Sequence, residues 1–212
     1  MTVAGDGGKA RVTADSRMAR ARERLADVAR RRATGWSTLT LVFAAPSPDL
    51  LQALSSRSVF RSLVEAVGWM DSDRDRFLSD VAALDAYAQR TDLDPDGASR
   101  ELQAEHERLF GDAGAARLVD EMESLATLCR EEQAAWAAGD DERAKSLRLD
   151  EHRRVGATIA DEAPVLCDRI RATGRSELYR AAAGILLELV RIESGRHYPG
   201  AVLREVFPGD AG

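Results

Sequence analysis

The 212-residue sequence has few of the residue types that staple small domains or bind metals. Its two cysteines, Cys129 and Cys167, stand alone without a C-x-x-C pair, and a chain of this length needs no disulfide staples. Zinc sites usually combine about four clustered ligands, and the two cysteines lie far apart in the sequence. We therefore expect free thiols, no metal site and a reducing, cytoplasmic location.

Long apolar runs are also lacking. The longest, "LTLVFAA" and "GILLELV", fall far short of the ~20 residues that a membrane-spanning helix needs. The start, "MTVAGDGGKARVTADSR", has no apolar core of a secretory signal. The sequence thus predicts neither export nor stable membrane insertion.

Helix-forming residues dominate what is present, with 44% hydrophobic, 31% charged and only 5% aromatic residues. Neither alternating strand patterns nor repeats of solenoid length occur. The composition and length predict an all-α, single-domain helical bundle over residues 15–205, preceded by a disordered tail (1–14) and followed by a short tail (206–212).

Charge is unevenly distributed along the chain. The net charge is -6, but the segment Lys9–Arg32 holds nine basic and three acidic residues, which is +6 and leaves -12 for the rest. Arginine outnumbers lysine 28 to 2, which we attribute to coding bias rather than to phosphate binding. An acidic body disfavours nucleic acid as a partner and favours a basic peptide.

The first helix is expected from Asp15, a candidate N-cap, to Gly35, with its arginines on a solvated basic face rather than on a membrane. Ser47 and Pro48 give the start signal of a short helix. Asp94 and Pro95 open a helix that runs through Phe110. Apolar residues follow one face of this first helix, at Met18, Ala21, Leu25 and Val28. A second apolar face is predicted for the helix that follows "DSDRDR", at Phe77, Val81, Leu84 and Tyr87.

A helical hairpin is predicted around Gly139, a C-terminal stop, and Asp140, the cap of the return helix. Val155 and Ile159 extend the return helix until Pro164 punctuates it, and Ser176 caps the last helix. The inward stripes are Leu118, Met122, Leu125, Cys129 and Trp136, then Leu178, Ala182, Ile185, Leu189 and Ile192.

No catalytic motif emerges from these helices. A di-iron bundle needs paired Glu-x-x-His motifs, but Gln103 precedes His106 by three residues and Leu149 precedes His152. Gly-rich phosphate loops do not occur. Cys129 and Trp136 are interpreted as core residues, and both histidines as surface residues. We expect a non-enzymatic protein without cofactors.

The order of the segments resembles the TorD/DmsD/NarJ-like chaperones of molybdenum enzymes. The resemblance rests on Glu121–Cys129, the turn Gly139–Asp140 and the pair Glu151–His152, which match that family's helical hairpin. Three further segments agree in order and extend the resemblance from about Trp36 to Glu193: "LTLVFAAPSPDLLQAL", "EHERLFGD" and "SELYRAAAGILLELVRIE".

This resemblance implies a cytoplasmic chaperone that binds the N-terminal or twin-arginine signal segment of an apo-molybdoenzyme catalytic subunit before export. The peptide-binding residues it suggests are His106, Phe110, Asp120, Glu121 and His152. The sequence departs from the family between the L-F segment and the hairpin, where only "GDAGAARLV" replaces a longer loop. Whether the chain swaps domains to form a homodimer is left open.

Two alternatives from other classes remain. A one-component transcriptional regulator would need a helix-turn-helix, for which "RSVFRSLVEAVGW" (57–69) is the candidate segment, although Pro46 and Pro48 interrupt the expected three-helix head. A metal-binding helical bundle is the enzymatic alternative, and elemental analysis would test it.

Overall fold

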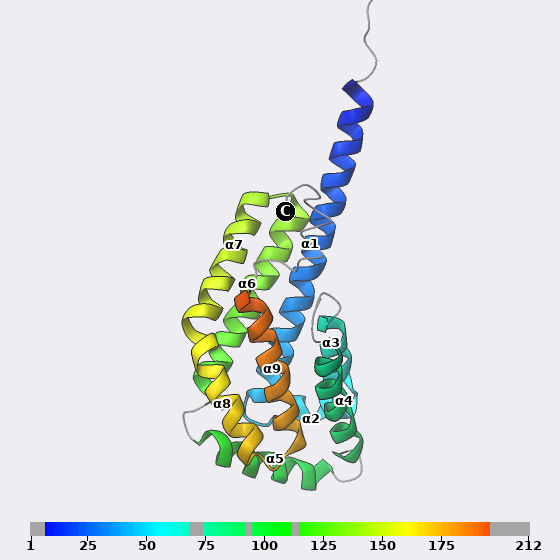
Figure 1. Cartoon of the computed structure of the whole chain (residues 1–212). Coiled ribbons are helices and arrows are strands. Elements are labelled where there is room, and N and C mark those ends of the chain that lie inside the picture. Colours follow the sequence, from blue (N-terminus) through cyan, green and yellow to red (C-terminus); the bar gives the residue numbers. More distant parts are fainter. Residues whose placement is uncertain (1–6, 68–73, 92–94, 112–114, 196–212) are drawn as a thin grey trace, which may run out of the picture.

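The computed structural model describes residues 7–67, 74–91, 95–111 and 115–195, which form helices and no strand (Figure 1). The prediction of an all-α fold is confirmed. The expected end of the domain at 205 and the tail 206–212 lie outside the described residues, as does the cap Asp94. The elements are α1 (Gly7–Phe43), α2 (Pro48–Ser55), α3 (Ser58–Val67), α4 (Arg74–Thr91), α5 (Pro95–Phe110), α6 (Ala116–Ala138), α7 (Asp141–Arg154), the π-helix η1 (Val155–Ile159), α8 (Ala160–Thr173) and α9 (Glu177–Gly195).

The long helix α1 forms the axis of the bundle. It packs along α6, which folds back onto α7, while α9 packs against α4 and α8, and α3 packs against α1. Figure 1 shows α5 lying across the end of the bundle that is opposite the start of α1. The core contains most residues of the predicted stripes; Phe77, Leu84, Met122, Cys129 and Ile185 are all buried. Met18 of the first stripe is not among them, because it is 47% exposed.

Helix α1 corrects two expectations from the sequence. It begins at Gly7, inside the expected tail 1–14, and not at Asp15. It also continues through Gly35, where we expected it to stop. A Cβ at Gly35 would lie 3.3 Å from the Cβ of Ala66 in α3. Glycine therefore serves the close approach of two helices here, and packing offsets its helix-propensity cost of about 1 kcal/mol.

Pro164 lies inside α8 and does not end a helix, contrary to the sequence prediction. Just before it, the N–H of Ala160 donates to the carbonyl of Val155, the wide i to i−5 pattern of a π-helix. Ala163 and Cys167 are buried on either side of the proline. Tertiary packing thus keeps the chain helical from α7 through η1 into α8.

Several predicted helix ends are confirmed. The Ser47 side chain accepts a hydrogen bond from the N–H of Leu50, and Pro48 is the first residue of α2. Gly139 ends α6 in the left-handed conformation at φ 76°, and the Asp140 side chain accepts from the N–H of Arg143.

The start of α9 is capped differently from the prediction. Ser176 precedes α9, but its hydroxyl is buried without a hydrogen-bond partner. Instead, a Glu105 carboxylate oxygen on α5 accepts from the N–H groups of Arg175, at 2.6 Å, and Ser176, at 3.4 Å. Arg108 also donates to Glu105, and these interactions lower the pKa of Glu105 to about 2 although burial opposes them. A residue on a different helix therefore supplies the cap.

Candidate functional site

Two of the residues that the family resemblance suggested, His106 and Phe110, lie in the core. They are 9% and 6% exposed, and their rings pack against each other with centroids 4.8 Å apart. Phe110 also meets Phe43 and Tyr179 edge-on, and His106 Nε2 lies 3.3 Å from the carbonyl oxygen of Phe43. The expectation of a surface histidine at 106 is wrong, and neither side chain offers a surface for a peptide.

The other three suggested residues lie on the α6–α7 hairpin, apart from the His106 cluster. Asp120 is exposed, and Glu121 forms an ion pair with Arg154 at 3.1 Å. His152 is half-buried, with Nδ1 3.0 Å from the carbonyl oxygen of Glu193. The structure therefore does not bring the five residues together into one site.

A buried network of charged side chains joins four helices in the interior. Arg32 Nη1 lies 2.7 Å from Glu132 on α6, and Arg32 Nε lies 2.7 Å from Glu193 on α9. Arg32 also pairs with Glu151 on α7, and Arg148 Nη1 lies 2.6 Å from Glu193. Each of the five side chains is at most 3% exposed. The expectation that the arginines of the first helix form a solvated face is therefore wrong for Arg32.

The charged groups of this network form ion pairs with one another. Burial alone would raise the pKa of Glu193, but the guanidiniums of Arg148 and Arg32 overcome it and hold that pKa at about 2. The Trp136 indole N–H donates to Glu132 at 3.0 Å. The network thus fixes how α1, α6, α7 and α9 sit against one another, a structural role with little capacity for chemistry on a ligand.

Neither cysteine is placed as a nucleophile. Cys129 and Cys167 are free and buried, and burial raises the pKa of each thiol to about 12. Both therefore stay protonated at neutral pH. The interpretation of Cys129 and Trp136 as core residues is confirmed, since they are 0% and 5% exposed. Within the described ranges, no group of three or more His, Cys, Asp and Glu side chains is arranged to hold a metal ion.

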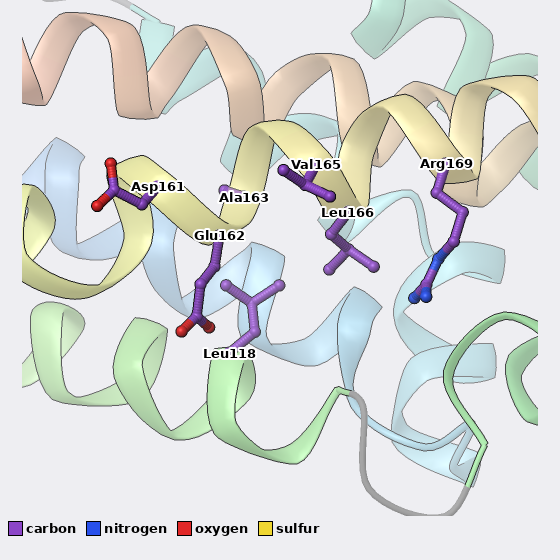
Figure 2. Close-up of a pocket in the computed structure, with 7 residues that line it drawn as sticks. All are labelled: Leu118, Asp161, Glu162, Ala163, Val165, Leu166 and Arg169. Carbon is purple, nitrogen blue, oxygen red and sulfur yellow. The ribbon is translucent and has the colours of Figure 1, made fainter.

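The surface feature with the clearest capacity for binding is a groove between the start of α6 and the first half of α8 (Figure 2). It encloses about 430 Å³. Glu162 and Leu166 point from α8 toward Leu118 on α6, Asp161 lies at the same end as Glu162, and Arg169 lies at the other (Figure 2). We call this feature the α6–α8 groove; its lining residues are Leu118, Asp161, Glu162, Ala163, Val165, Leu166 and Arg169.

The α6–α8 groove combines an apolar wall with an acidic end. Val165 is 72% exposed, the highest exposed fraction among the large hydrophobic residues of the described chain. Asp161 and Glu162 are also exposed, and Glu162 pairs with Arg117 at 3.0 Å on the surface. Arg169 donates to the carbonyl of Leu109 at 3.1 Å and so is held at the other end. Such a surface can accept an apolar side chain next to a cation.

Sequence reasoning did not identify this groove, although one signal for it was present. On α8 the buried residues Ala163, Cys167 and Ile170 follow helical spacing, and Val165 falls outside that stripe. Val165 lies outside the core stripe and follows the carboxylates Asp161 and Glu162 by a few positions, and this pattern indicates an exposed surface that is partly apolar and partly acidic. Its second wall, Leu118, comes from a helix more than 40 residues away in sequence, which only the fold reveals.

The segment proposed for a helix-turn-helix forms the turn after α2 and the helix α3. Val59, Leu63 and Ala66 are buried, and α3 packs on α1. The exposed side chains of α3 are Arg61, Val64 and Glu65, a mixed rather than basic set. Gly68 and Trp69 lie outside the described residues.

None of the helices that the structure describes is both long and apolar enough to cross a membrane. Comparisons with protein-family models, with curated proteins and with solved structures find no match for this chain.

Proposed function

We propose that the protein is a non-enzymatic cytoplasmic chaperone that binds the N-terminal or twin-arginine signal segment of an apo-molybdoenzyme subunit and assists its assembly before export. Two observations support this proposal: the order of sequence segments that resembles such chaperones, and the α6–α8 groove. The groove carries the proposal, because it is the place where an arginine-bearing apolar peptide finds complementary chemistry. The client contacts are assigned to the groove in place of His106 and Phe110, which are buried.

The chemistry of the groove matches both parts of such a peptide. A guanidinium binds a carboxylate in a fork geometry. At one end of the groove Glu162 points toward Leu118, and Asp161 carries a second carboxylate that points away from Leu118 (Figure 2). The apolar stretch that follows the arginines then lies along Val165 and Leu166 toward Leu118. The pair between Arg117 and Glu162 is exposed, so displacing it costs at most about 1 kcal/mol.

The internal arrangement of reactive groups also supports a binding role. The thiols are buried and protonated at neutral pH, and the charges of the interior are bonded to one another. His152 is anchored to a backbone carbonyl. The lining residues of the groove, in contrast, include exposed carboxylates and apolar side chains but no thiol, hydroxyl or imidazole.

Peptide binding tests the proposal directly. A fluorescent peptide with two arginines followed by an apolar stretch is titrated with the protein and with the double variant Asp161→Lys/Glu162→Lys. We expect saturable binding that weakens at least about tenfold in the variant, because attraction becomes repulsion. The matched control is Glu101→Lys on α5, an exposed carboxylate outside the groove lining, and it should bind as the wild type does.

Two results would count against the proposal. If the peptide fails to bind at any protein concentration, or binds equally to the lysine variant, then the groove does not recognise it. A tagged protein expressed in its native host identifies the client: recovery of an apo-molybdoenzyme subunit with its signal segment intact supports the role. A salt-dependent mobility shift of DNA would instead favour the regulator.

A further inference from the structure

Helix α1 extends beyond the bundle at its N-terminal end. Arg22 forms a two-point ion pair with Asp141 at the tip of the α6–α7 hairpin, with oxygen–nitrogen distances of 2.7 and 3.0 Å. Figure 1 shows α1 continuing past this tip, away from the other helices. We call residues 7–20 the arm. At 1.5 Å per residue the arm is about 20 Å long, and its last turn lies beside the hairpin tip, where Ala19 and Gly139 line a common pocket.

The arm continues the stripe that is buried further along α1. Leu25 is 5% exposed and packs in a small cluster with Trp136, Ala135 and Ala144. Met18 occupies the same stripe two turns earlier, beyond the hairpin tip, and is 47% exposed. A helix of this length is marginal in water without tertiary contacts. The arm thus has a face that a partner would stabilise.

The arm is also basic, whereas the rest of the chain is acidic. Arg17 and Arg20 are exposed and, three residues apart, share one face of the helix, next to the face that carries Met18. The arm itself carries four basic residues and one acidic residue within a chain of net charge -6. The best complement to the arm on this molecule is therefore an exposed apolar surface with carboxylates at its edge, which describes the α6–α8 groove.

The groove of the same copy is out of reach of its own arm. Helix α1 runs without a break from Gly7 to Phe43, and α8 lies toward the opposite end of the bundle (Figure 1). Folding the arm back would require breaking α1 inside the bundle, where Arg32 and Trp36 are 1% exposed. An arm that enters an α6–α8 groove must come from another molecule.

We propose that the arm of one copy docks in the α6–α8 groove of a second copy, as an amphipathic helix in a groove. Met18 packs against Val165 and Leu166, while Arg17 and Arg20, on the neighbouring face of the arm, lie toward Asp161 and Glu162 at the edge of the groove. The inference rests on the proposed function in one respect: the same groove takes the client peptide. A client that presents arginines beside apolar residues then competes with the arm, so self-association keeps the groove covered until a client arrives.

Charge exchange between full-length chains tests this docking. One variant reverses the arm (Arg17→Glu/Arg20→Glu) and the other reverses the groove (Asp161→Lys/Glu162→Lys). All four positions are exposed, so both variants should retain the wild-type circular dichroism spectrum and melting temperature. Sedimentation velocity at low salt should show the wild type self-associating, with the association constant of each variant lowered at least about tenfold.

The mixture of the two variants is the decisive sample. In a mixed dimer the reversed arm of one variant meets the reversed groove of the other, and the native arm meets the native groove. The mixture should therefore form mixed dimers, although each variant alone associates at least about tenfold more weakly than the wild type. The control Arg100→Glu, an exposed arginine on α5, should associate as the wild type does. A wild type that stays monomeric at its highest soluble concentration, or a mixture that fails to associate, overturns the docking.

Adding the arginine-bearing peptide separates this inference from the proposed function. Dissociation of the wild-type dimer by the peptide supports both. Self-association that obeys the charge exchange but does not respond to the peptide upholds the docking and defeats the chaperone role. Peptide binding to a chain that is always monomeric supports the chaperone role and overturns the docking.

Discussion

The buried network predicts that Arg32 contributes far more to stability than any arginine on the surface of the same helix. Arg32 is 1% exposed and contacts carboxylates from three other helices, Glu132, Glu151 and Glu193. The substitution Arg32→Met keeps a long apolar side chain in the same space. It leaves three buried carboxylates facing a single guanidinium, that of Arg148.

The expected loss follows from the cost of an uncompensated buried charge. Removing one partner of a buried ion pair costs about 3–5 kcal/mol, and here three carboxylates lose a partner, so we expect about 4–5 kcal/mol. For a domain of this size, each kcal/mol corresponds to about 2–4 °C, so the melting temperature should fall by roughly 10–15 °C. Substituting Glu132→Gln in the same chain should recover about 1–3 kcal/mol, because the double variant has one uncompensated carboxylate fewer.

Urea unfolding followed by far-ultraviolet circular dichroism measures these differences. Arg30→Met is the matched control, because Arg30 lies on the same helix and also pairs with two carboxylates, Asp27 and Glu65, but is 38% exposed. The free energy of unfolding should change by no more than about 1 kcal/mol in this control. An Arg32→Met variant as stable as the control, or a double variant as unstable as the sum of its single substitutions, would refute the reasoning.

Three further predictions concern other parts of the molecule. Glu105→Gln should lower the free energy of unfolding at neutral pH and make its loss in acid less steep. The pKa of Glu105 is about 2 in the folded chain against an ordinary 4.5, so its contribution, on the order of 3 kcal/mol, is present above pH 4.5 and disappears as the pH falls toward 2. Measuring the unfolding free energy of both proteins across this pH range checks the prediction. Gly35→Leu should cost about 1–3 kcal/mol in urea unfolding, because the new side chain meets Ala66 of α3, whereas Gly156→Leu, at a position with open space, should be better tolerated. Cys129 and Cys167 should react slowly with iodoacetamide in the native protein and rapidly in denaturant, as mass spectrometry would show; rapid native labelling of either would contradict the burial and the raised pKa of its thiol.

Local signals in the sequence predicted much of the fold. The starts at Ser47 and Pro48, the turn at Gly139 and Asp140, and the buried stripe through Met122 and Cys129 all involve residues within a few positions of one another. Capping and helical periodicity act over that range, so they can be predicted from the sequence without a tertiary structure. The same reasoning erred at Gly35 and Pro164, because packing overrides the helix propensity of single residues.

The candidate site was less accessible to sequence reasoning. The resemblance to a chaperone family directed attention to His106 and Phe110, which the structure buries against Phe43 and Tyr179. The α6–α8 groove needs Leu118 of α6 opposite Leu166 of α8, and this placement depends on how the chain returns from α7 through η1. The chaperone role itself stays a prediction that the peptide experiment decides.

By itself, the sequence determined the helical class, several helix ends and most of the apolar stripes, since these depend on neighbours along the chain. Only the tertiary structure decided which charged residues are buried. Arg32, Glu132, Glu151 and Glu193 resemble solvated charges in sequence, yet they meet at one point inside the bundle. The reason is that a buried charge is tolerable only beside its counter-charge, and those partners come from helices up to 161 positions apart.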